Sequence, residues 1–440
     1  MTGREFLLDH LAVPGVQSLD GYRRAGGFAA LTKALRSLSP AEVRAEISRS
    51  GLRGRGGSCY PSGLKVEAMA QAADPERYVV MNGEEGGPGA FKDGRLLQGS
   101  PFLILEGILL AGFAAGARHG ICIIRKGAKD TRCRFQEAVG QMTEQGLVGT
   151  DILGRGFAFE LRVEIGAGVF CCGEETALLE SAEGRRGHPR VRPPYPVERG
   201  FQGHPTLVSN VETLANVPFI IDRGADWFRG IGLPAEPGTR VLSVSGHIRH
   251  PGVYEVPTGT PLRRVLELAG GARPGEEIVA VLPGGAVSGF LPARDFDAPV
   301  SQEGLERYGT CLSSGAVIVF SDRCCFVQVA QRLAAFFEQE SCGRCTPCRE
   351  GTARLREILE DISGPRRKTA GEGRRDAWRE VPPPRPFALL EPLVETISRA
   401  SACGLGRSAG VAITSALRLF PDEFAAHFER QECPRQVCWK

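Results

Sequence analysis

The chain has 440 residues, of which 42% are hydrophobic and 24% are charged. This composition is typical of a globular protein, and the length exceeds that of one ordinary core, so we expect two to four domains. The formal net charge of +3 argues against a nucleic-acid binder, whose affinity would come from many phosphate contacts.

Two features bear on where the chain resides. The longest apolar stretch, Phe102 to Ala115, contains Glu106 and is too short to span a bilayer, so we expect no direct membrane insertion. Fourteen cysteines could form a secreted disulfide framework, but they are spread through a long glycine-rich chain that starts without a signal-peptide pattern. We therefore predict a cytoplasmic location, with any attachment to the cytoplasmic face of the inner membrane made through partner subunits.

The first 50 residues are predicted to form an N-terminal helical segment. Ser39 and Glu42 form a capping box with Pro40 at the first helical position. Gly51 supplies a helix stop. A helix is therefore expected over residues 40–50, and it leads directly into a glycine-rich run.

An alternation of short β-rich runs and longer helical patterns follows, which predicts an α/β domain with a largely parallel sheet. The expected strands are Tyr78–Met81, Ile121–Ile124 and Phe159–Glu164. The expected helices cover about 94–115, 128–145 and 174–183. The Pro- and Gly-rich residues 187–206 are expected to form a long ordered loop.

The glycine-rich run at residues 51–65 is a candidate ligand loop. Its glycines could bring backbone amides close to a phosphate or a flat ring, with positive charge from Arg53, Arg55 and Lys65. The run lacks the Gly-Lys-Ser/Thr of a Walker loop, and no strand precedes it as a dinucleotide fingerprint requires. A mobile surface loop is the alternative.

Two further loops carry paired acids. Glu84 and Glu85 follow the strand expected at 78–81, at the carboxyl end where α/β sheets bind ligands. Glu174 and Glu175 stand at the start of an expected helix. The second pair could serve a ligand or only complement the helix dipole.

A boundary near residues 230–238 separates this region from a second domain. Strand-like runs at Arg240–Gly246, Gly252–Glu255 and Ala316–Phe320, with one helix at 261–269, suggest a small β-grasp-like domain. From about residue 327 the pattern is helical. Residues 364–386 are expected to be a flexible, solvated insertion, or alternatively a docking surface for an acidic partner.

Three cysteines in the helical region have the spacing of an iron–sulfur ligand loop. Cys342, Cys345 and Cys348 follow the C-x2-C-x2-C pattern, and the best fourth ligand is Cys403 in Ser-Ala-Cys-Gly-Leu-Gly. A structural zinc site is the alternative, but such sites usually come as two C-x2-C pairs. The pattern predicts an electron carrier whose cluster joins two separate segments.

The remaining cysteines and histidines show no such spacing. Small core residues are expected at Cys122, Cys133, Cys311, Cys324 and Cys325. Cys433 and Cys438 are suggestive, but a pair alone cannot complete a metal site. The seven histidines lack partner spacing and are expected to be structural or exposed.

Five segments resemble a known family. They are Gly-Leu-Arg-Gly-Arg-Gly-Gly, Gly-Pro-Gly-Ala-Phe-Lys-Asp, Cys-Gly-Glu-Glu-Thr-Ala-Leu, Asn-Val-Glu-Thr-Leu-Ala and Glu-Ser-Cys-Gly-Arg-Cys-Thr-Pro-Cys-Arg-Glu-Gly, in order over residues 51–403. Together they resemble the NADH-binding flavoprotein subunit of respiratory complex I. Related diaphorase subunits of NAD-linked formate dehydrogenases and hydrogenases share the pattern.

The resemblance implies an NADH dehydrogenase subunit in which FMN takes hydride from NADH and passes single electrons to a [4Fe–4S] cluster. The implied partners are a thioredoxin-like [2Fe–2S] subunit and a larger iron–sulfur subunit. The implied fold is an α/β flavin-binding domain at 51–235, a small β-grasp-like (α+β) domain at 238–325, and a C-terminal α-helical bundle at 327–440 carrying the cluster.

The resemblance also assigns roles to single residues of this chain. The flavin and dinucleotide loop would comprise Gly54, Gly56, Gly57 and Lys65. The surroundings of the FMN would comprise Asn82, Glu84, Glu85, Gly173, Glu174, Asn210 and Thr213. Tyr60 and Tyr195 would stack on the adenine, and Glu175 would disfavour a 2′-phosphate. No general base is expected, because hydride passes directly from nicotinamide to flavin.

The chain departs from the family pattern at several positions of these motifs. Gly87 replaces a glutamate, Phe170 a tyrosine, Ser209 an asparagine and Ala68 an aromatic residue, and Ser58-Cys59-Tyr60 replaces Ala-Gly-Phe. These changes leave two alternatives open. The chain could be a diaphorase subunit of a soluble NAD(P)-linked formate dehydrogenase or hydrogenase, or an electron-relay subunit that has lost dinucleotide binding.

Overall fold

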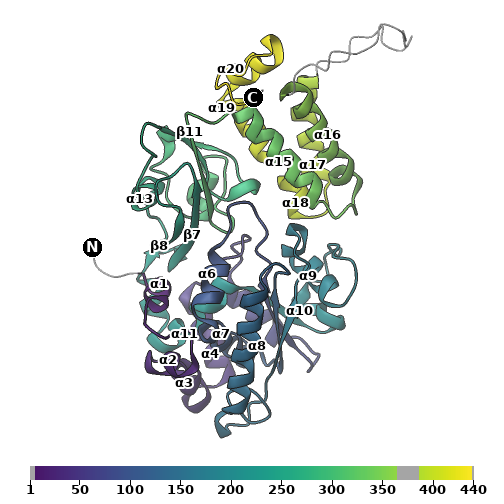
Figure 1. The fold of residues 1–440 in the computed structure, drawn as a ribbon. Coiled ribbons are helices and arrows are strands. Elements are labelled where there is room, and N and C mark those ends of the chain that lie inside the picture. Colours follow the sequence, from purple (N-terminus) through teal and green to yellow (C-terminus); the bar gives the residue numbers. More distant parts are fainter. Residues whose placement is uncertain (1–4, 364–385, 439–440) are drawn as a thin grey trace.

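The computed structural model describes residues 5–363 and 386–438. The parallel sheet and the N-terminal helices lie at one end of the molecule and the C-terminal helices at the other, with a second sheet beside the latter (Figure 1). The insertion expected at 364–386 lies outside the described residues, apart from Pro386, where the short helix η6 (Pro386–Leu389) begins.

The N-terminal segment forms four helices that pack on the α/β region. They are α1 (Leu7–Leu11), α2 (Leu19–Arg24), α3 (Ala29–Ser37) and α4 (Pro40–Ser50). The predicted capping box of α4 is confirmed: Ser39 Oγ accepts from the Glu42 amide, and the Glu42 carboxylate accepts from the Ser39 amide at 2.7 Å. Gly51 ends the helix in a left-handed conformation with φ of 69°.

The α/β region contains a four-stranded parallel sheet of order β3-β2-β1-β4. Its strands are β1 (Tyr78–Gly83), β2 (His119–Ile124), β3 (Glu160–Ile165) and β4 (Thr206–Asn210). The three expected strands are confirmed. The sequence predicts no strand at β4, because its five residues directly follow a Pro- and Gly-rich stretch.

Helices precede, connect and follow the strands of this sheet. They comprise α5 (Ser62–Ala70), α8 (Lys129–Glu144), α9 (Glu175–Ala182), α10 (Pro196–Arg199), α11 (Val211–Arg223) and α12 (Ala225–Arg229), with short helical turns at Ile152–Gly154, Phe170–Gly173 and Phe201–Gly203.

The expectation of a single helix over residues 94–115 is wrong. The segment forms α6 (Lys92–Gly99) and α7 (Pro101–Ala115), which meet at 97°. Pro101 has no amide hydrogen and disfavours a helical conformation at Ser100, which instead has φ of −154° and ψ of 76°. Among the described helices, none is by itself long and apolar enough to cross a membrane.

Helix α7 is buried on nearly all sides, and its one charged residue has a structural role. The Glu106 carboxylate accepts from Tyr22 Oη at 2.5 Å and from the amides of Phe28 and Leu31 at 2.8 and 2.9 Å. These bonds satisfy the buried carboxylate and hold the N-terminal helices against the core.

The second sheet has five strands in the order β10-β9-β11-β7-β8. They are β7 (Thr239–Gly246), β8 (Gly252–Pro257), β9 (Ile278–Leu282), β10 (Leu291–Pro292) and β11 (Ala316–Ser321), with helices α13 (Leu262–Leu268) and α14 (Gln302–Glu306) and turns at Gly285–Val287 and Ala293–Asp295. β11 pairs parallel with β7, and the other pairings are antiparallel. A two-stranded ribbon of β5 (Gly232–Leu233) and β6 (Glu236–Pro237) precedes it.

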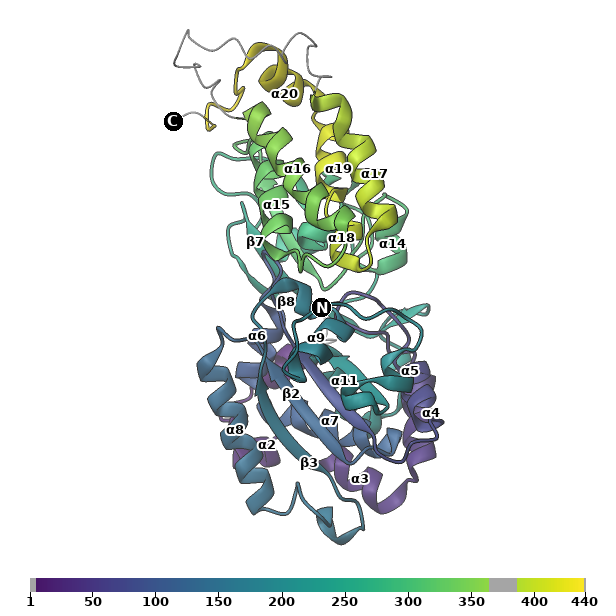
Figure 2. The same cartoon turned by 90° about the vertical axis from the view of Figure 1, so that its right-hand side faces the viewer.

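The C-terminal region is helical, as expected. It contains α15 (Phe326–Glu340), α16 (Thr346–Ser363), α17 (Leu390–Ala400), α18 (Gly404–Ser408), α19 (Val411–Leu419), α20 (Pro421–Ala425) and a π-helical turn, η7 (Ala426–Arg430). In Figure 2 these helices stand above the parallel sheet, with α9 near their lower end. Their core includes Cys171 and Cys172 from the α/β region and Phe320 from the second sheet.

Candidate functional site

The parallel sheet has a topological switch point between β1 and β4. The chain runs outward from β1 to β2 and β3, then returns to the opposite side of β1 to form β4. Asn82 and Asn210 are register partners at the carboxyl ends of these two strands. Open α/β sheets bind their ligands outside the carboxyl ends of the strands at such a point.

The two asparagines connect the strand ends to the surrounding loops. Asn82 Nδ2 donates to the Gly173 carbonyl at 2.9 Å, and Asn82 Oδ1 accepts from the Glu84 amide at 3.1 Å. Asn210 caps α11 by accepting from the Glu212 amide at 3.0 Å, while its Nδ2 donates to Asp93 at 2.6 Å. Several residues predicted for the FMN site therefore meet here.

The glycine-rich loop folds against this edge of the sheet. The Gly54 amide donates to the Tyr60 carbonyl at 2.9 Å, and the Arg55 amide donates to Thr213 Oγ1 at 2.8 Å. A Cβ added at Gly56 would lie 2.9 Å from the Asn210 Cβ, and Gly57 has φ of +127°. Only glycine fits at both positions, so the loop can approach the switch point closely.

Two positively charged residues of these loops are buried and make structural contacts. We expected Arg55 to supply positive charge to a ligand, and the structure corrects this. Arg55 is fully buried, donates to the Pro237 carbonyl at 2.8 Å, and lies within 4.0 Å of Glu212 and Glu236. Burial, together with the charge of Arg240, lowers the pKa of Arg55 to about 10. Lys92 is likewise buried and pairs with Glu212 at 2.8 Å.

Lys65 lies at the edge of the same site. Its Nζ donates to the Glu175 carboxylate at 2.6 Å and to the Val208 carbonyl at 2.9 Å. Glu175 also lies 3.4 Å from Arg192, while Glu174 caps α9 through the amides of Thr176 and Ala177. The two acids therefore have different roles, one in the helix cap and one in a partly exposed ion pair.

Glu84 and Glu85 lie beside the end of β1, the first buried and the second half-buried. Glu84 accepts from the Gly168 amide at 2.7 Å, and burial raises its pKa. Glu85 accepts from the amides of Asp93 and Gly94 at 3.1 and 3.0 Å, at the start of α6. Burial, followed by the negative charge of Asp93, raises the pKa of Glu85 to about 7.

Two aromatic rings near these loops are exposed. Tyr60 is 53% exposed and Tyr195 is 51% exposed. Tyr60 lies within the glycine-rich loop, two residues before α5, and Tyr195 directly precedes α10. Exposed flat rings of this kind are available to stack on a planar ligand.

A cavity beside Glu85 brings in residues that the sequence analysis missed. It has a volume of about 570 Å³ and lies between the ends of β1 and β2 and the loop after β3. Arg125 and Lys126 line it, and Arg125 Nη1 donates to the Glu85 carbonyl at 2.9 Å. The available signal was their place directly after the expected strand at 121–124, at the same carboxyl edge.

The four predicted cluster cysteines line one cavity in the helical region. Cys342 and Cys345 lie on the loop between α15 and α16, Cys348 on the first turn of α16, and Cys403 at the N-cap of α18. A Cβ added at Gly406 would lie 2.4 Å from Ser401 Oγ and 3.1 Å from the Cys348 Cβ. Glycine here lets the Cys403 turn approach Cys348. Four thiols are the donor set of a [4Fe–4S] cluster.

The loop that connects β3 to α9 contacts both sites. Cys171 lines the thiol cavity, and two residues later Gly173 accepts from Asn82 at 2.9 Å. The Phe170 amide donates to the Glu340 carboxylate at 2.6 Å, directly before the cysteine loop. The switch-point site and the thiol cavity are therefore joined by one short segment.

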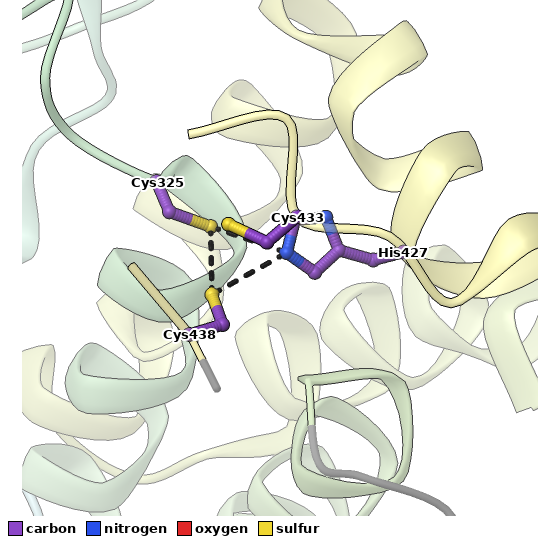
Figure 3. A group of neighbouring side chains, drawn as sticks. All are labelled: Cys325, His427, Cys433 and Cys438. Atoms are coloured by element: carbon purple, nitrogen blue, oxygen red, sulfur yellow. Dashed lines mark hydrogen bonds between the residues drawn. The ribbon is translucent and has the colours of Figure 1, made fainter. Parts of the chain in front are cut away.

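A second group of cysteines adds to the sequence analysis. Cys325, His427, Cys433 and Cys438 place their donor atoms within 4.8 Å of one another (Figure 3). Cys325 was expected to be a small core residue and the histidines to be structural or exposed, and both Cys325 and His427 are buried. No sequence pattern indicated their closeness, because the members of the group are brought together only by the packing of α15 against the C-terminal segment.

Comparisons with known proteins agree with these two sites. Residues 47–219 match the Nuo51 FMN-binding domain, residues 328–427 the NADH-ubiquinone oxidoreductase-F iron-sulfur binding region, and residues 241–291 the SLBB domain. The chain is 39% identical over 429 residues to the second NADH-quinone oxidoreductase F-type subunit of Rhizobium meliloti (strain 1021), covering 97% of this chain and 98% of that protein.

Relatives from hydrogenases are similarly close. The NADP-reducing hydrogenase subunit HndC of Solidesulfovibrio fructosivorans is 40% identical over 424 residues, covering 96% of this chain and 83% of that protein. A chain in the crystal structure of the NAD+-reducing [NiFe]-hydrogenase in the H2-reduced state superposes with a TM-score of 0.80 and 34% identity. This match covers 97% of the present chain and 67% of that chain.

Proposed function

The chain belongs to the family of NADH-quinone oxidoreductase F-type subunits and related hydrogenase subunits, and from this we propose that it oxidises NADH within a multi-subunit complex. It is a flavoprotein subunit that uses FMN and a [4Fe–4S] cluster. The observation that carries the proposal is the segment 171–173, which lines the thiol cavity at one end and contacts Asn82 at the other.

The bound groups supply the redox chemistry: FMN accepts a hydride from NADH and releases electrons singly to the cluster. The protein supplies the binding and orientation. We propose that the FMN site comprises Gly54, Gly56, Gly57, Lys65, Asn82, Glu84, Glu85, Gly173, Glu174, Asn210 and Thr213. The closeness of Gly56 to Asn210 supports this assignment, because it places the glycine-rich loop at the carboxyl ends of the strands.

For the dinucleotide we propose that Tyr60 and Tyr195 stack on the adenine and that Glu175 disfavours a 2′-phosphate. The exposure of both rings supports the first role. The position of Glu175, partly exposed and paired with Lys65, supports the second. No protein group is required as a general base, because the hydride passes directly between the two ring systems.

The proposed cluster ligands are Cys342, Cys345, Cys348 and Cys403. Their shared cavity supports this set, and the two segments that supply them pack together in the helical region. We further propose three functional domains, an FMN- and NADH-binding domain at 51–235, a β-grasp-like domain at 238–325 and a cluster-binding helical domain at 327–440. The helices of residues 1–50 pack on the first of these.

The partners follow from the family. We propose that electrons leave through a thioredoxin-like [2Fe–2S] subunit and a larger iron–sulfur subunit, in the cytoplasm or at the cytoplasmic face of the inner membrane. Two parent complexes remain candidates, complex I and a soluble hydrogenase or formate dehydrogenase. Similarity to NADH-quinone oxidoreductase F-type subunits supports the first, and the resemblance to an NADP-reducing hydrogenase subunit, together with Gly87, supports the second as the alternative.

A titration with NADH tests the enzymatic role. The visible absorption of the flavin in the purified protein should be bleached rapidly by NADH. A flavin that responds to neither NADH nor NADPH would instead support a relay subunit that has lost dinucleotide binding.

A further inference from the structure

Four side chains from three parts of the helical region lie together beside the start of α15. Cys325 is the N-cap residue of α15, His427 lies on the π-helical turn η7, and Cys433 and Cys438 lie on the segment that follows (Figure 3). Cys325 and Cys433 are buried, as is His427, which is only 1% exposed. None of these four residues belongs to the site proposed for FMN or for the cluster.

The separations fit one small ion. Cys325 Sγ lies 3.4 Å from His427 Nε2 and 3.3 Å from Cys438 Sγ, and His427 Nε2 lies 3.4 Å from Cys438 Sγ. A tetrahedral zinc site, with Zn–S of about 2.3 Å and Zn–N of about 2.0 Å, holds its donor atoms about 3.5 to 3.8 Å apart. The three separations above lie within a few tenths of an ångström of this range. The Cys433 sulfur lies within 4.8 Å of the other donor atoms, so a shift of about 1 Å would complete such a site.

The histidine is oriented as a metal ligand requires. Its Nδ1 lies 2.8 Å from the Glu423 carbonyl, so this nitrogen carries the proton and donates to that oxygen. The Nε2 atom is then the unprotonated acceptor that faces the sulfur atoms. Metal-binding histidines commonly have this second hydrogen bond, which fixes both the tautomer and the ring.

Backbone amides lie close to two of the sulfur atoms. The amides of Val437, Cys438 and Arg435 donate to the Cys433 sulfur. The Cys325 sulfur accepts from the Gln328 amide at 3.5 Å, at the positive end of a 15-residue helix. Amide donors of this kind stabilise negative charge on metal-bound sulfur.

We propose that Cys325, His427, Cys433 and Cys438 bind one Zn²⁺ ion as a structural Cys3His site. Thiolate and imidazole donors select zinc over magnesium or calcium. All four positions are filled by protein, which is the arrangement of structural rather than catalytic zinc. A four-iron cluster does not fit a group only 4.8 Å across, because each thiolate would bind a separate iron atom.

The site would fasten the C-terminal segment to the start of α15. That helix has 15 residues and is therefore about 22 Å long, and its other end enters the Cys342 loop. The zinc would thus stabilise the helical region from the end opposite the cluster. Its loss should loosen the C-terminal segment while leaving the FMN site intact.

The test is metal analysis of the purified holoprotein, produced in medium supplemented with zinc chloride. The parent should contain about one zinc per chain in addition to its cluster iron. Cys433→Ser and Cys438→Ser should lose most of this zinc yet retain iron and FMN. Cys324→Ser is the matched control, because Cys324 is adjacent to Cys325 but contacts His247 and not the group.

X-ray absorption at the zinc edge of the parent, which needs no variant, should report three sulfur ligands and one nitrogen ligand. Four outcomes would overturn the proposal. They are a parent without zinc, zinc loss in the control equal to that in the variants, a disulfide between Cys325 and Cys438 in non-reduced peptides, and iron bound by these residues. Bleaching of the flavin by NADH, measured on the same samples, separates this result from the test of the proposed function.

Discussion

Lys65 and Glu175 form an ion pair at the edge of the proposed dinucleotide site, with 2.6 Å between Nζ and the carboxylate. Lys65→Ala would remove the nearer of the two cations that face Glu175, the other being Arg192 at 3.4 Å, and would leave excess negative charge at the proposed dinucleotide site. A hydrogen bond to a charged group contributes about 1.5 to 3 kcal/mol, so we expect the Michaelis constant for NADH to rise about tenfold or the FMN content to fall.

The control for this variant is Lys33→Ala. Lys33 also donates to main-chain carbonyls, those of Ile221 and Asp222, but at the far end of α11. Its loss should leave both the Michaelis constant and the flavin content unchanged. Equal behaviour of the two variants would remove Lys65 from the site.

Gly87 is the departure from the family motif that bears on donor choice. A Cβ added there would lie 3.4 Å from the Phe170 ring, an ordinary contact, so Gly87→Glu should fold. The new carboxylate would repel the 2′-phosphate of NADPH, and about 1 kcal/mol of such repulsion corresponds to about fivefold. We expect the ratio of specificity constants, NADPH over NADH, to fall by about this factor.

The parent protein has a further expected property here. Without a glutamate at position 87, it should accept NADPH better than relatives that carry one. A parent that already strongly prefers NADH, or a ratio that Gly87→Glu leaves unaltered, would show that Glu175 alone decides the preference.

Glu85 makes stability depend on pH. Its pKa in the folded protein is about 7, raised from 4.5 chiefly by burial. Because the folded state holds this proton more tightly, the stabilisation is present below about pH 4.5 and is lost as the pH rises through 7. The difference amounts to about 2 to 3 kcal/mol.

The comparison of the parent with Glu85→Gln isolates this effect from other titrating groups. The thermal midpoint of the parent should fall relative to that of the variant between pH 5 and pH 8. Two midpoints that shift in parallel over this range would show that Glu85 is ionised throughout in the folded protein.

The helical elements were predicted from the sequence where a local signal was sufficient. The capping box at Ser39 and the stop at Gly51 give the bounds of α4 correctly, because both act within one helical turn. The break between α6 and α7 had an equally local signal in Pro101, which the continuous apolar pattern obscured.

The strands depend more on their neighbours, and here prediction was incomplete. β4 has five residues and pairs with β1, which is distant in the sequence, and β10 has only two residues, which is too short for a recognisable pattern. The same dependence on tertiary contacts explains which functional groups could be predicted from the sequence. The Cys342 triplet was visible from its spacing, whereas Cys325 and His427 are related only by tertiary packing.

A substitution in the short helix α18 tests how the proposed cluster site is built. Gly406→Ala would bring a methyl group to within 2.5 Å of the Ser401 side chain and 3.1 Å of the Cys348 Cβ, so the Cys403 turn must move. Even a displacement of about 1 Å would disturb a four-ligand site, so we expect cluster content to fall severalfold with FMN unchanged. Gly404→Ala is the matched control, because nothing lies within 4 Å of a Cβ there.

Iron content and the absorbance near the cluster band give the readout for this pair. Comparable cluster content in the two variants would mean that the closeness of the Cys403 turn to Cys348 is not required for assembly.

At the scale of the whole molecule, the two proposed redox sites belong to different regions that meet at the two loops flanking α9. The Phe170 amide contacts Glu340, and Arg344 Nη1 donates to the Pro189 carbonyl at 2.5 Å, so the contact spans both regions. The four proposed cluster ligands nevertheless all lie in the helical region. Removal of the cluster should therefore leave the flavin site folded.

The most direct test of electron transfer from NADH to the cluster is a titration with NADH followed by paramagnetic resonance and flavin absorbance, on the parent and on Cys403→Ala. In the parent, NADH should bleach the flavin and produce the signal of a reduced four-iron cluster. In Cys403→Ala the flavin should still be bleached, with no cluster signal. A normal cluster in the variant, or an unresponsive flavin in the parent, would contradict the account.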